Sequence, residues 1–213
     1  MTIRVVLVDD HAVLRDGLKA LFSGARDMEV VGEAGDGREA IRQILQLEPD
    51  VAVMDIAMPG LNGIEAVRAI REHGSKTRIL MLSMHSTSEF VFRALEAGAD
   101  GYVLKQCAGM EVVTAVRSVQ AGRRYLSRAI SKTDLAAAQD SAQASPLARL
   151  STRESEVLQL VVEGKASAEI AGLLHLSPKS VDTYRNRVMK KLGTKDVTGL
   201  VKFALQHGLT TLD

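Results

Sequence analysis

The feature that most constrains the fold is an alternation of short apolar runs with amphipathic helical patterns in residues 1–122. Five runs have the length of a buried strand: 3–8, 29–34, 51–54, 77–83 and 101–104. After each run, apolar residues recur at helical spacing. Strict alternation of strands and helices predicts a parallel sheet with helices on both faces. We therefore expect an α/β domain built on a doubly wound, five-stranded parallel sheet.

Reactive or charged side chains follow four of the five predicted strands. They are Asp9 and Asp10 after the first strand, Asp55 after the third, Ser83 at the end of the fourth, and Lys105 after the fifth. Each has an ordinary explanation as a helix cap, a turn residue or a solvated charge. Because ligands of parallel sheets bind at the carboxyl ends of the strands, their joint placement favours a common site.

The residue types in this set indicate phosphoryl chemistry. Three neighbouring carboxylates repel one another unless a cation separates them, and carboxylate oxygens with open water positions suit Mg²⁺. A carboxylate beside Mg²⁺ can act as a nucleophile and form an aspartyl-phosphate, with Lys105 and Ser83 as partners for the phosphoryl oxygens. The sequence has no phosphate-binding glycine loop and no paired His/Cys spacing, so neither nucleotide nor zinc binding is expected.

Four motifs in the correct order resemble the receiver domain of response regulators. They are Asp9-Asp10, residues 54–60 (Met-Asp-Ile-Ala-Met-Pro-Gly), Leu82-Ser83 and residues 101–105 (Gly-Tyr-Val-Leu-Lys). The resemblance covers residues 1 to about 122. It implies a flavodoxin-like fold with strand order 2-1-3-4-5.

The resemblance also implies a role for each acidic residue. Asp55 would be the phosphoacceptor. Mg²⁺ would be bound directly by Asp10, Asp55 and the backbone carbonyl of Ala57, with Asp9 acting largely through water.

Further roles follow from the same resemblance. Ser83 and Lys105 would contact the phosphoryl group, and Ser83 and Tyr102 would form the switch, in which Tyr102 rotates inward when Ser83 moves. A half-buried strand tyrosine is the alternative for Tyr102. Ala57 and His85 occupy positions that tune dephosphorylation in this family.

Residues 123–146 are predicted to be a linker. The stretch is rich in Ala, Ser, Gln and Asp, and it has no large apolar residue between Leu135 and Leu147. Such a segment cannot build a core, so a flexible tether is expected in preference to a short amphipathic helix.

Residues 147–213 carry the start and stop signals of four helices. Ser151 to Glu154 form a capping box, Ser167 is expected to cap a short helix at 168–174, and Ser177-Pro178 begin a helix that Gly193 ends. Asp196 is expected to cap the last helix. Two short helices joined by a brief turn predict a DNA-reading helix-turn-helix.

Helical spacing separates the two sides of the 178–192 helix. Val181, Val188 and Leu192 share the inward side. The other side is polar and basic, which suits a DNA groove, although a solvated surface is the alternative. Its residues are Lys179, Thr183, Asn186, Arg187 and Lys190.

This half resembles a LuxR-type DNA-binding domain, and the whole chain resembles a NarL/FixJ-type two-component response regulator. The matching segments are 150–154, 169–171, 176–181 and 191–193. The resemblance places base reading at Asp182, Thr183 and Asn186. Asp182 stands where a Lys is common, so it either accepts from a cytosine amino group or makes a local contact with Arg185 or Asn186.

We therefore expect a cytoplasmic transcription regulator rather than a turnover enzyme. The expected partners are a sensor histidine kinase, double-stranded promoter DNA and, after phosphorylation, a second copy of the chain in a homodimer.

The two halves of the chain differ in charge. Residues 1–122 contain 13 Lys and Arg against 17 Asp and Glu, whereas residues 149–213 contain 10 against 7, which suggests different partners for the two halves. No signal peptide or membrane span is predicted, and the single Cys107 fits a reducing compartment.

Two alternatives remain at this point. A phosphatase or phosphotransferase could use the same acidic cluster, but Ala57 stands where a second Asp would serve as general acid. Alternatively, the first domain could be a scaffold that works without phosphorylation, although a complete acidic site argues against this.

Overall fold

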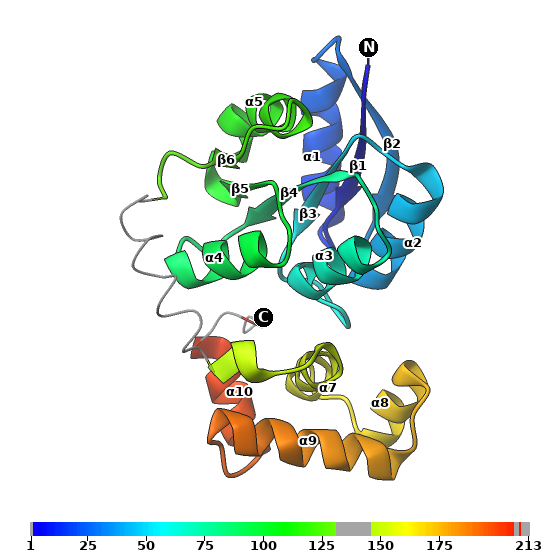
Figure 1. Ribbon diagram of the computed structural model, residues 1–213, viewed down its shortest axis with the longest axis vertical. Coiled ribbons are helices and arrows are strands. Elements are labelled where there is room, and N and C mark those ends of the chain that lie inside the picture. The colour runs from blue at the N-terminus through cyan, green and yellow to red at the C-terminus, as the bar shows by residue number, and fades with distance from the viewer. Residues whose placement is uncertain (1, 131–145, 207–208, 210–213) are drawn as a thin grey trace. The chain divides into compact units, whose positions relative to one another are not determined.

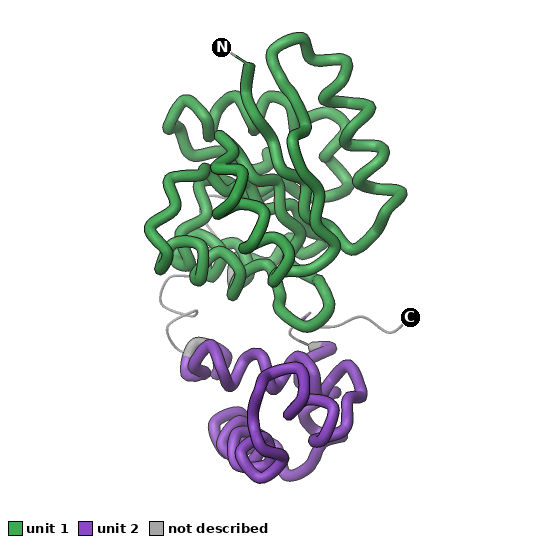
Figure 2. Tube along the Cα trace, turned by 90° about the vertical axis from the view of Figure 1, so that its right-hand side faces the viewer, with its two compact units in different colours: residues 1–142 green, residues 143–213 purple. Residues whose placement is uncertain are grey.

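The computed structural model describes residues 2–130, 146–206 and 209. The chain forms two compact units, residues 1–142 and 143–213, which are shown in different colours in Figure 2. Most of the predicted linker lies outside the described residues. Within the described part of the chain, no helix is long and apolar enough to cross a membrane.

The first unit contains a parallel sheet of six strands in the order β2-β1-β3-β4-β5-β6. The strands are β1 (Ile3–Val8), β2 (Met28–Ala34), β3 (Val51–Asp55), β4 (Arg78–Ser83), β5 (Gly101–Leu104) and β6 (Tyr125–Leu126). The predicted parallel α/β architecture and the order of its first five strands are confirmed. The predicted count of five strands is wrong, because β6 comes from the segment assigned to the linker.

Helices cover both faces of this sheet (Figure 1). On one face lie α1 (Ala12–Ser23) and α5 (Ala108–Gln120), whose apolar sides pack on β1, β3, β4 and β5. On the other lie α2 (Gly37–Leu47), α3 (Gly63–Glu72) and α4 (Ser88–Glu96). Strands buried on both faces favour apolar side chains on both sides, which explains the largely apolar runs of β1, β3, β4 and β5.

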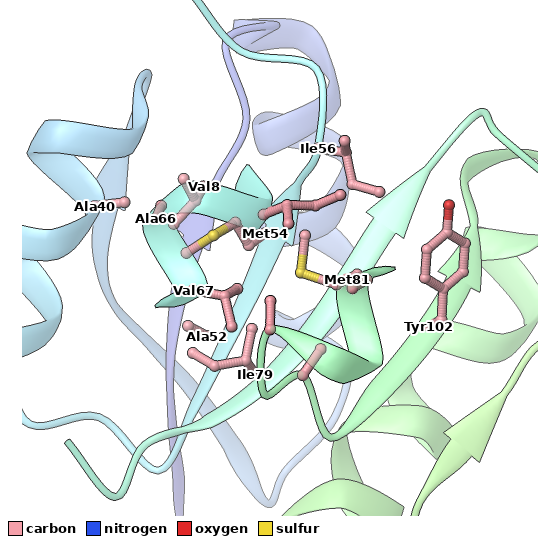
Figure 3. Close-up of a cluster of buried hydrophobic side chains, with 14 of the residues drawn as sticks. Val8, Ala40, Ala52, Met54, Ile56, Ala66, Val67, Ile79, Met81 and Tyr102 are labelled. Atoms are coloured by element: carbon pink, nitrogen blue, oxygen red, sulfur yellow. The ribbon is translucent and has the colours of Figure 1, made fainter. Parts of the chain in front are cut away.

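The core on the second face is drawn in Figure 3. Met54 from β3 and Met81 from β4 lie in its centre, and Ala66 and Val67 approach from α3. Tyr102 of β5 belongs to the same cluster and is fully buried.

β6 keeps the chain attached to the sheet beyond α5. Its residues pair with Gly101 and Tyr102 of β5. The backbone N–H of Ser127 donates to the carbonyl oxygen of Tyr102 (2.8 Å), and the Ser127 hydroxyl donates to Glu111 (2.5 Å). Ile130 is buried in the same core as Tyr102. Residues up to 130 are therefore part of the first unit and not a free tether.

The second unit is helical in its described part. It contains a short 3₁₀ helix η2 (Pro146–Arg149) and the helices α7 (Thr152–Val162), α8 (Ser167–Leu174), α9 (Pro178–Leu192) and α10 (Val197–Gln206). Apolar side chains from α7, α8, α9 and α10 form one core. The four predicted helices are confirmed.

The helix caps follow the prediction with one exception. Ser151 and Glu154 form the capping box, Ser177 caps α9, and Asp196 accepts from the backbone N–H of Gly199 (2.7 Å). The prediction that Ser167 caps α8 is wrong. The N-cap residue is Ala166, whose backbone N–H donates to Glu169 (2.7 Å), and Ser167 is the first residue of the helix.

Candidate functional site

Three charged side chains converge at the carboxyl ends of β1, β3 and β5. The ammonium group of Lys105 lies 2.6 Å from Oδ2 of Asp55 and 2.7 Å from Oδ2 of Asp9. Both carboxylates are buried, with 1% and 2% of Asp9 and Asp55 exposed. The parallel sheet brings the carboxyl ends of these strands to one edge, so Lys105 pairs with Asp55, which lies 50 positions earlier in the chain, and with the more distant Asp9.

The two carboxylates that pair with Lys105 also belong to a wider acidic cluster. Asp9, Asp10, His11 and Asp55 each offer a ligand atom, and these atoms lie within 4.8 Å of one another. The oxygen-rich donor set suits a hard divalent cation. Ala57, expected to contribute its carbonyl oxygen, lies in the loop two residues after β3.

The sequence interpretation did not include His11 in this cluster. Its Nδ1 lies 2.7 Å from Oδ1 of Asp10 and 3.1 Å from Oδ1 of Asp9. The nearby Asp10 carboxylate raises the pKa of His11 above its usual value. Its position directly after the acidic pair was the available signal.

Burial and charge act against each other at the ion pair. Burial raises the pKa of Asp55 to about 6, although the neighbouring Lys105 counteracts the rise. Burial lowers the pKa of Lys105, but the carboxylates of Asp55 and Asp9 more than offset this and hold it above its usual value. Lys105 is therefore a permanent positive charge at neutral pH, whereas Asp55 is a carboxylate of increased basicity.

A glycine that the sequence interpretation overlooked sets the backbone around Asp55. A Cβ atom on Gly63 would lie 1.9 Å from the carbonyl oxygen of Asp55, so only glycine permits α3 to begin here. The N–H of Gly63 also donates to the carbonyl of Ile56 (2.9 Å), and Asn62 caps the helix. The Asn-Gly pair after the strand was the sequence signal.

Ser83 and Tyr102 meet at the loop after β4. The Ser83 hydroxyl oxygen accepts from the backbone N–H of His85 (3.1 Å), and the Tyr102 hydroxyl donates to the carbonyl oxygen of His85 (2.7 Å). Tyr102 is fully buried rather than half-buried (Figure 3). Burial raises the pKa of Tyr102, so its phenol remains a hydrogen-bond donor at neutral pH.

In the second unit, α9 presents the predicted polar and basic face to solvent. All five residues of this face are exposed: Lys179, Thr183, Asn186, Arg187 and Lys190. Val181, Val188 and Leu192 are buried on the opposite side. We call the five exposed residues the α9 face.

Asp182 lies beside the α9 face and has protein partners. Its Oδ1 accepts a hydrogen bond from the Ser167 hydroxyl (2.9 Å) and lies 3.2 Å from Nη2 of Arg185. This ion pair with Arg185 is the local contact that the sequence offered as the alternative to base reading.

Comparisons with known protein families match both units. Residues 5–117 match the model described as response regulator receiver domain. Residues 148–204 match the model described as bacterial regulatory proteins, luxR family.

Several characterised proteins are similar along nearly the whole chain. The response regulator UvrY of Escherichia coli K12 is 37% identical over 208 residues, covering 97% of this chain and 95% of UvrY. The oxygen regulatory protein NreC of Staphylococcus aureus is 37% identical over 214 residues, covering 97% and 98%. The RcsB response regulator of Salmonella typhimurium superposes with a TM-score of 0.69 at 27% identity, covering 99% of both chains. RcsB in a complex with DNA superposes with a TM-score of 0.57 at 27% identity, covering 99% of this chain and 100% of RcsB.

The relatives are regulators and not turnover enzymes. With a receiver domain, a LuxR-type domain and full-length relatives of this kind, the chain belongs to the two-component response regulators of the LuxR-type, NarL/FixJ family.

Proposed function

We propose that a sensor histidine kinase phosphorylates Asp55 and that the phosphorylated chain controls transcription through its α9 face. The observation that carries the proposal is the Asp55–Lys105–Asp9 cluster at the carboxyl edge of the sheet. A buried carboxylate with raised basicity and an adjacent fixed cation is equipped to accept a phosphoryl group.

In the proposed transfer, an Asp55 oxygen attacks the phosphorus of a phosphohistidine. The new O–P bond forms as the P–N bond breaks, and the imidazole leaves with the bonding electron pair. The Lys105 ammonium then binds a phosphoryl oxygen. Asp10, Asp55 and the Ala57 carbonyl would hold Mg²⁺, with Asp9 acting largely through water, and the ion would neutralise charge on the phosphoryl oxygens.

The dianion on Asp55 gives a physical reason for a switch. It attracts the Ser83 hydroxyl, which here accepts from the N–H of His85. Because the Tyr102 hydroxyl donates to the carbonyl of the same His85, a shift of Ser83 disturbs both contacts. We propose that this repacking of the loop after β4 is the signal.

For the second unit we propose binding to double-stranded promoter DNA. Lys179, Arg187 and Lys190 are suited to phosphates, and Thr183 and Asn186 to base edges. The similarity to RcsB in its DNA complex supports this assignment. Paired half-sites would require a homodimer, which we propose forms after phosphorylation. We also propose a cytoplasmic location, because the protein would need access to promoter DNA.

The test treats the full chain with Mg²⁺ and acetyl phosphate and measures its intact mass and its binding to DNA duplexes. We expect one phosphoryl adduct and altered DNA affinity in the wild type, and no adduct in Asp55→Asn. Asp16→Asn removes an exposed carboxylate on α1 and should keep the adduct.

Two results would contradict the proposal. If the wild type gained no phosphoryl adduct under these conditions, Asp55 would not be the phosphoacceptor. This result would favour a receiver domain that acts without phosphorylation. Sustained turnover of phosphate esters would favour the phosphatase alternative.

A further inference from the structure

The flank of α9 that faces α8 carries a charge arrangement separate from the α9 face. Asp182 and Arg185 lie one helical turn apart on this flank, and both are only partly exposed. Ser167, the first residue of α8, lies opposite them.

One carboxylate oxygen holds this arrangement together. Oδ1 of Asp182 accepts from the Ser167 hydroxyl (2.9 Å) and pairs with Arg185 (3.2 Å), whose Nη1 lies 3.5 Å from the same hydroxyl. The Nε of Arg185 is buried, and the described residues offer it no hydrogen-bond partner. The ion pair thus holds Arg185 against Asp182 on the flank of α9 that faces α8, and the Ser167 hydroxyl connects this ion pair to α8.

The ion pair changes the charge that α9 offers to DNA. A free arginine directly before Asn186 would be a strong phosphate ligand, because guanidinium groups bind phosphate with paired N–H donors. Paired with Asp182, its positive charge is partly compensated and its reach is restricted. Without this ion pair, the carboxylate of Asp182 would repel the phosphates of DNA.

We propose that Asp182 is a positioning residue that restrains Arg185 from binding DNA phosphates, and that it does not read a base. The inference rests on the proposed DNA binding of this unit. Asp182 then sets the strength and salt dependence of binding, whereas base preference remains with Thr183 and Asn186.

The experiment measures how much Arg185→Ala changes DNA affinity in two backgrounds, wild type and Asp182→Ala, using the full chain and a pool of randomised duplexes. In the wild type we expect little change. Asp182→Ala should bind roughly fivefold more tightly at about 0.15 M salt, with the salt slope steeper by about 0.9, as one added phosphate contact predicts. The double variant should lose this gain.

A second measurement separates positioning from base reading. Sequence selection from the same pool should give the same base preferences for Asp182→Ala and the wild type. Asp182→Asn keeps an acceptor for Ser167 but removes the ion pair, so it should reproduce the affinity gain. It also tests the inference if the alanine variant is poorly folded by circular dichroism.

Three outcomes would overturn the inference. Arg185→Ala could weaken binding equally in both backgrounds, which would mean that Arg185 already contacts DNA. Asp182→Ala could lose preference at one base position with an unchanged salt slope, which would make Asp182 a base reader. A wild type that binds no duplex would overturn the proposed function as well, whereas the first two outcomes leave it intact.

Discussion

At the scale of single residues, Asp55 combines two properties that oppose each other. Its carboxylate is almost fully buried, and burial raises the pKa to about 6 even with Lys105 at 2.6 Å. A group whose pKa is higher in the folded state than in the unfolded state binds a proton preferentially when folded. Ionisation of Asp55 at neutral pH therefore lowers the stability of the folded state.

This cost gives a pH-dependent prediction for Asp55→Asn in chelator-treated, Mg²⁺-free buffer. The penalty is absent below the unfolded pKa of about 4 and grows until pH exceeds the folded pKa. We expect the variant to be more stable than the wild type by about 3 kcal/mol at neutral pH, and no more stable below about pH 4. Urea unfolding of the first unit across this range measures the difference.

The control for this prediction is Asp16→Asn. The Asp16 carboxylate is exposed and pairs with Lys19, which lowers its pKa through the hydrogen bond and the charge of that lysine. Its removal should not stabilise the protein at neutral pH. An Asp55→Asn variant that is less stable than the wild type at neutral pH would contradict the account of burial given above.

At the scale of secondary-structure elements, Lys191 connects α9 to the start of α7. The ammonium group of Lys191 lies 2.6 Å from Oε2 of Glu154 and donates to the carbonyl of Arg149 (2.8 Å). Glu154 also closes the capping box at the start of α7 by accepting from the N–H of Ser151 (2.8 Å). Burial raises the pKa of Glu154, but the hydrogen bonds from Lys191 and Ser151 more than offset this and hold it below its usual value.

Glu154→Gln should isolate the ion pair, because glutamine also closes a capping box. The lowered pKa means that the ion pair stabilises the fold at neutral pH and that this stabilisation is lost as pH falls through the carboxyl pKa. We expect a loss of about 2 kcal/mol at pH 7 that shrinks as pH falls through the lowered pKa of this carboxyl group, measured by chemical unfolding of the second unit. The matched control is Glu169→Gln in α8, where the carboxylate of Glu169 accepts from the backbone N–H of the N-cap residue Ala166.

At the scale of the whole molecule, β6 determines where the receiver ends. Ile130 is buried in the receiver core, and Ser127 is bonded to both Tyr102 and Glu111. β6 also pairs with the strand that carries Tyr102 and precedes Lys105, so the outgoing chain is attached next to the proposed switch.

A chain that ends at residue 122 should accordingly be less stable than one that ends at residue 130. It loses the burial of Ile130 and the hydrogen bonds of β6, which together are worth about 2–4 kcal/mol. Comparing their urea midpoints tests this. Equal midpoints would support the predicted linker boundary at residue 123.

The parts of the fold that depend on local patterns were predictable. The apolar runs and the helical spacing between them identified β1 to β5 and α1 to α5, since strands buried on both faces are built mainly from apolar residues. β6 was missed because a pair of residues has no periodicity and a polar stretch follows it. The cap at Ser167 was predicted wrongly because its hydroxyl bonds to Asp182, which is 15 residues away in the chain.

The sequence by itself determined that the chain has a parallel α/β half with acidic residues at its strand ends and a helix-turn-helix half, because periodicity and cap residues are local properties. Only the tertiary structure decided how those residues pair. Lys105 pairs with both Asp55 and Asp9. Gly63 has no side chain and therefore leaves room for the carbonyl oxygen of Asp55. Asp182 pairs with Arg185 and lies beside the α9 face. The Asp55–Lys105–Asp9 and Gly63 contacts join elements distant in sequence, so only packing decides them, whereas the sequence offered the Asp182–Arg185 pair as one of several alternatives and the structure selects it.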